Sequence, residues 1–355
     1  MKGAEFPAIG KISPEFFDKY IYPRLGVRRS DVMVGPQHGV DIGVVRVSDG
    51  KVMAVTTDPI YIVPQYGWEK AAWFAWHILA SDVTTSGFPP AYAVFDFNLP
   101  MSITEDEFET VWEVMHRESE KYGTSVIAGH TARYTGTDYP MVGGATFMSV
   151  GPEDKYLTPN MAKEGDAVVI TKGAAIEAVG IFANTFKNYI RQKLGEEIFS
   201  KAERLFYKMS TVDDALTAVK VGVRDSGVTA MHDATECGVL GGVFEIAQAS
   251  GKGIMIHKDK IPVSPEAGAV CKLFDIDPYT SISEGTLVLT VRPGKTDELV
   301  RVFSQAGIES AVIGEILPSK DGRWILENGD KKPLVHPRAD PFWHAIADAF
   351  EKKLT

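Results

Sequence analysis

The stretch that most constrains this chain runs from Val228 to Ile256 and reads VTAMHDATECGVLGGVFEIAQASGKGIMI. Asp233 precedes Gly238, and apolar residues then recur at helical spacing. Glycines at a helix start let backbone N–H groups close on an anion, which the helix dipole also favours. Because a carboxylate there would repel the anion, we expect a divalent cation between them. The alternative is a strand-to-helix turn whose glycines serve close packing, and this segment alone does not decide between the two.

Length and charge narrow the class of protein. A chain of 355 residues exceeds one comfortable core, so two domains are expected. Lys and Arg number 37 and Asp and Glu 47, a net charge of −10 without a basic block, which argues against binding nucleic acid or a membrane surface. No long apolar run and no signal-peptide pattern is present. Cys237 and Cys271 make no disulfide framework, so we expect a cytoplasmic protein.

The pattern along the first part predicts strands and amphipathic helices. Asp49-Gly50 indicates a hairpin, and Thr104 with Glu107 forms a capping-box signal before a helix that ends near Gly123. Further helices are expected over 13–25 and 68–86, and further strands over 91–97, 125–128 and 141–150.

The segment 151–165, polar and proline-bearing, is the best domain boundary. A buried strand is expected over 167–171, then mixed helices and strands without regular βαβ alternation, which favours an α+β fold. We therefore predict domains at 1–155 and 156–335, and a C-terminal tail at 336–355 that contains an amphipathic helix.

Four aspartates stand near the ends of apolar segments or inside one: Asp41, Asp58, Asp82 and Asp233. Oxygen ligands at this density suit Mg²⁺, which bridges readily to phosphate oxygens. Taken singly, each is more often a turn former, a cap or a solvated side chain. Asp82, between Ala80 and Val83 in a small-residue helix, most needs a partner. Spacing alone does not show that the four converge.

Eight short segments occur in the order found in a known superfamily. Together they resemble the aminoimidazole ribonucleotide synthase (PurM-like) superfamily, and within it the branch of the hydrogenase maturation factor HypE. The segments are GVDIGVV at 39–45, TTDP at 56–59, ASDVTTSGFPP at 80–90, AGHTARYTG at 128–136, GDAVVITK at 165–172, MHDATECGVLGGVFEIAQASGKGI at 231–254, SEGTLVLTV at 283–291 and AVIGEI at 311–316.

The resemblance implies a fold, ligands and a site. It implies a two-domain α+β PurM-like fold, a homodimer formed through the N-terminal sheets, and a C-terminal α/β domain. It further implies ATP bound between the domains and Mg²⁺ held by the four aspartates. The residues expected in catalysis are Asp82, His130 and Lys11, and those expected at the nucleotide are Asp41, Asp58, Gly129, Thr131, Arg133, Asp233 and Gly238. Of these, Arg133 is chosen for its bidentate guanidinium and Gly238 for the glycine-rich helix start, not from the resemblance.

The sequence departs from the HypE pattern at its C-terminal end and after Asp233. HypE-type chains end in a cysteine that carries a carbamoyl group, whereas this sequence ends Lys353-Leu354-Thr355, and Glu236-Cys237 replaces an Arg-Gly pair. Cys237 is either a nucleophile at a helix start or, more often for such a turn, a packed thiol. His232 is interpreted as structural, and the role of Glu284 is left open.

Three functions follow as hypotheses. The first is an ATP- and Mg²⁺-dependent enzyme that phosphorylates an oxygen of a small, unidentified acceptor. The second is a HypE-like hydrogenase maturation dehydratase that works with a maturation-protein partner. The third is a dimer that binds nucleotide without turnover.

Overall fold

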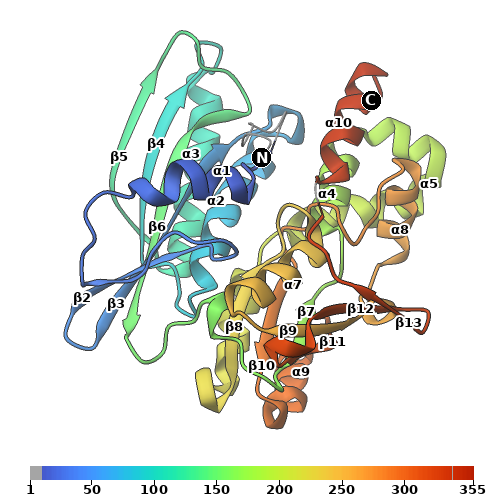
Figure 1. Ribbon diagram of the computed structural model, residues 1–355. Helices are drawn as coiled ribbons and strands as arrows, with labels where there is room; N and C mark the ends of the chain where they lie inside the picture. The colour runs from blue at the N-terminus through green and yellow to red at the C-terminus, as the bar shows by residue number, and fades with distance from the viewer. Residues whose placement is uncertain (1–9, 338) are drawn as a thin grey trace.

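The computed structural model describes residues 10–337 and 339–355, and the strands of that part form two sheets (Figure 1). The first sheet has the order β1-β2-β3-β6-β4-β5, in which β4 and β5 alone are parallel neighbours. Helices α2 (Trp68–Thr84) and α3 (Glu105–Tyr122) pack together on one face of it. Its strands are β1 Val32–Val34, β2 Gly43–Ser48, β3 Lys51–Tyr61, β4 Tyr92–Leu99, β5 Ser125–Arg133 and β6 Met141–Pro152.

Two predictions for this half, the hairpin and the capping box, are confirmed, and both depend on residues close together in the chain. The hairpin between β2 and β3 turns at Asp49-Gly50, with Ser48 opposite Lys51. The side chain of Thr104 accepts a hydrogen bond from the Glu107 amide while the Glu107 side chain accepts one from the Thr104 amide, so the capping box is present. These contacts begin α3 where the sequence predicts it.

Other boundaries differ from the prediction. The segment 13–25 is not one helix: it divides into α1 (Pro14–Phe16), a π-helical turn at Phe17–Ile21 and a 3-10 turn at Tyr22–Arg24. Pro23 lacks the N–H that a continuous helix needs there. Asp58 does not end its strand, because β3 continues to Tyr61.

The second half contains a seven-stranded sheet with the order β13-β12-β9-β11-β7-β10-β8, in which only β12 and β9 are parallel. Its strands are β7 Ala167–Thr171, β8 Val228–Asp233, β9 Gly253–His257, β10 Leu287–Val291, β11 Ser310–Leu317, β12 Arg323–Glu327 and β13 Asp330–Pro333. Its helices are α4 Ile176–Thr185, α5 Lys187–Arg204, α6 Val212–Ala218, α7 Gly238–Ala249, α8 Pro265–Leu273, α9 Thr296–Gln305 and α10 Pro341–Glu351.

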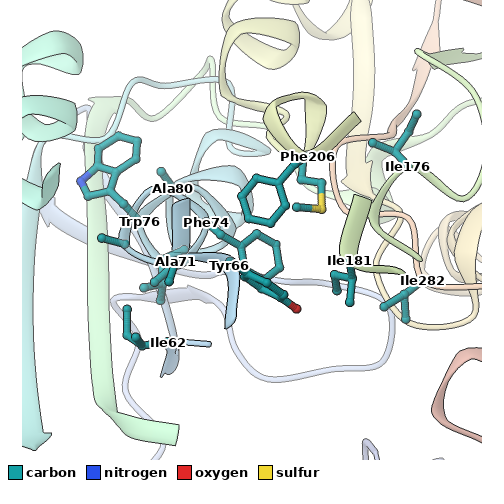
Figure 2. Close-up of a cluster of buried hydrophobic side chains, with 14 of the residues drawn as sticks. Ile62, Tyr66, Ala71, Phe74, Trp76, Ala80, Ile176, Ile181, Phe206 and Ile282 are labelled. Atoms are coloured by element: carbon teal, nitrogen blue, oxygen red, sulfur yellow. The ribbon is translucent and has the colours of Figure 1, made fainter. Parts of the chain in front are cut away.

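One hydrophobic cluster joins the two halves (Figure 2). Tyr66 and Phe74 of the first half lie against Phe206 of the second, with ring centroids 5.3 and 5.7 Å from that ring. Burying large aromatic rings against each other removes much apolar surface from water. The two halves are therefore held in one arrangement by a shared core.

The tail helix α10 packs rather than projecting into solvent. Phe342 is 2% exposed and its ring centroid lies 5.1 Å from that of Phe182 in α4. Asp340 caps the helix by accepting a hydrogen bond from the Phe342 amide. The tail is thus part of the helical layer beside α4, α5 and α8 (Figure 1).

The predicted fold class is confirmed: two sheet-containing parts of mixed α/β composition. The first sheet ends with β6 at Pro152 and the second begins with β7 at Ala167. A domain division at residues 155 and 156, with a tail from 336, remains our proposal. No helix in the described ranges is long and apolar enough to cross a membrane.

Candidate functional site

The four aspartates of the sequence analysis come from four different elements. Asp41 lies just before β2, Asp58 in β3, Asp82 in α2 and Asp233 at the end of β8. Asp233 therefore ends a strand instead of opening the glycine helix, since α7 begins at Gly238. The first three belong to one sheet and its covering helix, and the fourth comes from the other half.

The structure brings these carboxylates together, and we call them the carboxylate cluster. His232 Nδ1 lies 2.6 Å from Asp41 Oδ2 and 3.8 Å from Asp233 Oδ1. Thr56 Oγ1 lies 3.0 Å from Asp82 Oδ2, to which it donates, and 3.2 Å from the backbone oxygen of Asp41. Side chains from both halves thus meet at the contact between α2 and β8.

Burial and mutual repulsion disfavour the ionised forms of this cluster. Burial, reinforced by the carboxylates of Asp233, Asp58 and Asp41, raises the pKa of Asp82 well above its ordinary value. Burial, and then Asp41, raises the pKa of Asp233 to about 6. The pKa of Asp58 is also raised, chiefly by burial. Several acids forced toward neutrality in one place make a site that favours added positive charge.

A divalent cation fits the donors that are present. Asp233 is 1% exposed, and neither of its carboxylate oxygens accepts from an N–H or a hydroxyl group of the described residues, its neighbour being the carboxyl of Asp82. One ligand atom each from Asp41, His232 and Asp233 lies within 4.8 Å of the others. Buried carboxylate oxygens without donors are normally matched by a cation, and oxygen ligands suit Mg²⁺.

Lys11 lies at the edge of the cluster. Its Nζ is 3.3 Å from Thr235 Oγ1, and its backbone amide donates to Glu236 Oε2 at 3.1 Å. Partial loss of solvent lowers the pKa of the exposed Lys11 side chain, but the surrounding carboxylates, led by Glu245 and Asp41, outweigh it and raise the pKa overall. Lys11 is therefore a fixed positive charge beside the predicted metal ligands.

His232, interpreted from the sequence as structural, is central to the arrangement. It is 2% exposed, and its Nε2 lies 2.8 Å from Glu245 Oε2 while its Nδ1 faces Asp41. Burial lowers its pKa, but Asp41 and Glu245 reverse that effect and raise the pKa well above the ordinary value. Without a metal, an imidazolium between two carboxylates offsets part of the negative charge, and it would have to lose a proton before its nitrogen could bind a cation. Glu245 was not among the residues singled out from the sequence; it lies in α7, seven positions after Gly238.

Two further buried acids adjoin the cluster and were missed or left open. Glu284 is 1% exposed, and its Oε2 has no partner within the described ranges. Burial, with repulsion from Asp233 and Glu177, raises its pKa well above the ordinary value. Glu177 accepts a hydrogen bond from the Glu284 amide, and burial raises its pKa to about 8. Carboxyl groups of this kind carry protons near neutral pH.

The strip Gly129, His130, Thr131 and Arg133 is not brought to the cluster within one chain. These residues lie on β5, the edge strand, where Gly129 aligns through β4 and β6 with Asp58. Three interstrand spacings separate them by about 14 Å.

His130 also lies on the other face of the sheet from the cluster. It pairs with Asp96, whose strand neighbours Phe95 and Phe97 are the side chains that pack on α3. Since strand side chains alternate, His130 points away from the helices, whereas Asp58 shares its face with Thr56, which bonds to α2. Joint action of His130 and Asp82 in one chain is thus not supported.

Arg133 is occupied elsewhere, since its guanidinium donates to the backbone oxygen of Met101. Gly238 serves packing: its φ is +59°, its amide donates to the Thr235 carbonyl, and an added Cβ would lie 2.4 Å from the Ser281 oxygen. The packing alternative for this glycine is therefore the one that the geometry favours.

The thiol of Cys237 is packed as well. Burial raises its pKa to about 12, so a thiolate is disfavoured despite its place before α7. Its backbone amide donates to Asp340 Oδ2 at 2.7 Å, which puts a carboxylate of the tail at this helix start. A nucleophilic role for Cys237 has no support in this environment.

Comparison with known proteins identifies the family. The model of the AIR synthase related protein N-terminal domain matches residues 39–150, and that of the C-terminal domain matches residues 163–327. The chain is 25% identical to the carbamoyl dehydratase HypE of Rhizobium leguminosarum bv. viciae over 278 residues, covering 75% of this chain and 73% of that protein. It is 25% identical to the selenide, water dikinase of Carboxydothermus hydrogenoformans over 343 residues, covering 87% and 93%.

A solved structure shows the same fold. The hydrogenase maturation protein HypE in complex with ATP superposes with a TM-score of 0.63 at 18% identity, over 92% of each chain. The resemblance inferred from the eight segments is thus confirmed, together with the two-domain PurM-like architecture. Since both domain models match in order along the sequence, this chain belongs to the AIR synthase related protein family.

Proposed function

We propose that this protein is an ATP- and Mg²⁺-dependent enzyme that transfers phosphate to an oxygen of a small acceptor. The observation that carries the proposal is the buried carboxylate of Asp233, which accepts from no described N–H or hydroxyl group and lies beside Asp41 and Asp82. A similar fold occurs in a structure described as a complex with ATP, and relatives include a dikinase. Both facts favour nucleotide chemistry at the cluster.

The roles of the residues follow from their charges. Asp41, Asp58, Asp82 and Asp233 would hold Mg²⁺, which when bound neutralises phosphate charge and orients the phosphates. Lys11, at the edge of the cluster, is placed to contact a phosphate oxygen. The raised pKa values of Glu284 and Glu177 mean that each of these groups, once ionised, is a strong enough base to take the proton that the acceptor oxygen loses. Catalysis then depends on positioning and charge neutralisation.

The test compares ADP release by the wild type with that by Asp82→Asn and Asp233→Asn, in the presence of Mg²⁺ and ATP. Each variant removes one ligand charge at nearly constant volume, so we expect turnover to fall by at least about a hundredfold while the fold survives. Glu109→Gln, at an exposed position in α3, is the matched control. ADP release at the wild-type rate in both cluster variants would contradict the assignment of Asp82 and Asp233 as metal ligands.

A homodimer is part of the proposal. The face of the first sheet opposite α2 and α3 carries exposed apolar side chains, among them Tyr92 at 40% and Val150 at 38%. The edge strand β5 adds Ile127 at 56%. Exposed apolar side chains on an open sheet face and at its edge mark an interaction surface. His130 and Thr131 would then meet a nucleotide only in a site completed by a second copy.

A HypE-like maturation activity is the second candidate, since curated relatives carry that name. A carbamoyl group carried on a thiol needs a reactive cysteine. Burial raises the pKa of both Cys237 and Cys271 to about 12, so neither supplies a thiolate. Adding a panel of amides, thiamine phosphate and carbamoyl phosphate to the ADP-release assay separates the candidates by which acceptor stimulates turnover. Tight ATP binding with no stimulation would instead support a dimer that binds nucleotide without turnover.

A further inference from the structure

We propose that a pocket between the two halves, separate from the carboxylate cluster, binds a small zwitterionic amine of the amino-acid type. The pocket has a volume of about 410 Å³ and is called here the interdomain pocket. Its walls come from α2 and the end of α3 on one side, and from the 3-10 turn Leu205–Lys208, α6 and the segment before β11 on the other. None of the four aspartates of the cluster lines it. Its size suits a small organic molecule.

The floor of the pocket presents a hydrogen-bond acceptor that the described chain does not use. Asp214 is 1% exposed, and its Oδ2 accepts from Lys172 Nζ at 2.7 Å. Its Oδ1 has no donor from any described residue. Lys172 donates its other hydrogens to the backbone oxygens of Ser210 and Gly285, at 2.6 and 3.0 Å, so its ammonium is fully engaged. The vacant acceptor is best matched by a ligand ammonium.

The mouth of the pocket carries a free cation. Lys208 is exposed, and its ammonium makes no hydrogen bond or ion pair with the described residues. Lys121, the other lysine at the mouth, already lies 4.6 Å from the Tyr122 ring and 4.0 Å from a Glu118 oxygen. A ligand with its ammonium at the floor therefore meets Lys208 with an anionic end. Both signs of charge line the pocket, which favours a molecule that itself carries both.

Two aromatic side chains also line the pocket. Trp73 and Tyr207 meet edge to face with ring centroids 5.2 Å apart. Aromatic faces attract ammonium groups and pack well against aliphatic chains. The lining thus combines the buried acceptor of Asp214, the half-buried Trp73 and the exposed Lys208. This combination matches an amine with a short apolar body and a carboxylate.

A hydrolytic role for the same pocket is less well supported. Ser210 Oγ lies 2.7 Å from His77 Nδ1, and His77 Nε2 lies 3.3 Å from Glu118 Oε2, which is a nucleophile-base-acid order. An acyl transfer also needs free N–H donors for the oxyanion. The backbone amides of Ser210, Thr211 and Val212 are each already bonded. We therefore assign His77 to linking the two halves, and the pocket to binding.

Calorimetry and thermal shift with the twenty L-amino acids, each without ATP or Mg²⁺, test the proposal independently of the cluster. We expect at least one amino acid to bind, and its N-acetyl and decarboxylated derivatives to bind more weakly. Asp214→Asn should weaken that binding by at least about tenfold. Lys208→Ala should weaken it about threefold to fivefold, as for an exposed charge pair.

Lys220→Ala, at an exposed position outside the pocket, should leave binding unchanged and is the control. Because Asp214 is buried, the folding of its variant is also checked by circular dichroism. If Asp214→Asn does not fold, the binding measured for Lys208→Glu, a change at an exposed position, tests the proposal in its place. No binding of any amino acid to the wild type, or equal binding by wild type, Lys208→Ala and Lys208→Glu, would overturn the proposal. Loss of ADP release in cluster variants has no bearing on this result.

Discussion

Replacing Asp233 by Asn should make the metal-free protein more stable at neutral pH while removing its response to Mg²⁺. The ordinary aspartate pKa of 3.8 is raised to about 6 in the fold, chiefly by burial. A raised pKa means that the folded state resists ionisation of this carboxyl. Its destabilising effect therefore develops as the pH rises from 3.8 toward 6, and it is complete above 6.

The size of the effect follows from the shift. A difference of about two pKa units corresponds to roughly 3 kcal/mol at 1.36 kcal/mol per unit. Asp233 is 1% exposed, so solvent screening does not reduce this figure much. For a chain of this length the unfolding entropy converts it into a rise of about 4 °C in the melting temperature. Asn keeps the shape and can donate to a neighbouring carboxylate.

Differential scanning fluorimetry at pH 7.5 with EDTA measures this rise, with Glu109→Gln as the exposed control. The advantage of the variant should shrink as the pH is lowered from 6 toward 3.8. Adding Mg²⁺ should raise the melting temperature of the wild type and have little effect on the variant. A variant that melts at or below the wild type in EDTA would refute the account of the site as crowded, repelling carboxylates.

Three further changes test the packing around the site. Thr56→Val deletes the hydroxyl that donates to Asp82, so we expect a loss of about 1–2 kcal/mol in urea denaturation, and an unchanged midpoint would contradict the bond. Gly238→Ala adds a Cβ 2.4 Å from the Ser281 oxygen at φ +59° and should lower the free energy of unfolding by at least about 2 kcal/mol. Gly251→Ala, with φ +66° and open space around it, should lower it by about 1 kcal/mol. Equal losses in the two variants would show that the steric contact at Gly238 does not matter. Phe342→Ala removes a ring against Phe182 and should lower stability by about 3–5 kcal/mol in the same assay, while a loss below 1 kcal/mol would mean that α10 is loosely held.

Much of the local structure was predictable because its causes lie within a few residues. The capping box at Thr104 and Glu107 joins groups three positions apart, and the hairpin at Asp49-Gly50 needs only a turn between two alternating segments. The break within 13–25 was missed although Pro23 stands inside the segment. A proline inside a segment removes one backbone donor, which is a local signal against one continuous helix.

The site was predictable only in part. The four aspartates were identified by position in the chain and by resemblance, and the structure brings them together. His232 was interpreted as structural because the sequence gives no sign of the two carboxylates that bond to its ring, one of which, Asp41, is 191 positions away. His130 was assigned by motif, yet strand alternation and sheet order place it on the opposite face, three strands from Asp58.

The kinds of element, most of their positions and the candidate acidic residues could be read from the amino-acid order, because helix caps, turns and hydrophobic periods act between near neighbours. The tertiary structure alone decided that α2 of one half meets β8 of the other. Contacts between distant segments depend on how whole sheets and helices pack, and here the shared aromatic core of Tyr66, Phe74 and Phe206 sets that packing. The charge of each buried acid follows from its neighbours in space, so burial and repulsion could be assigned only after folding.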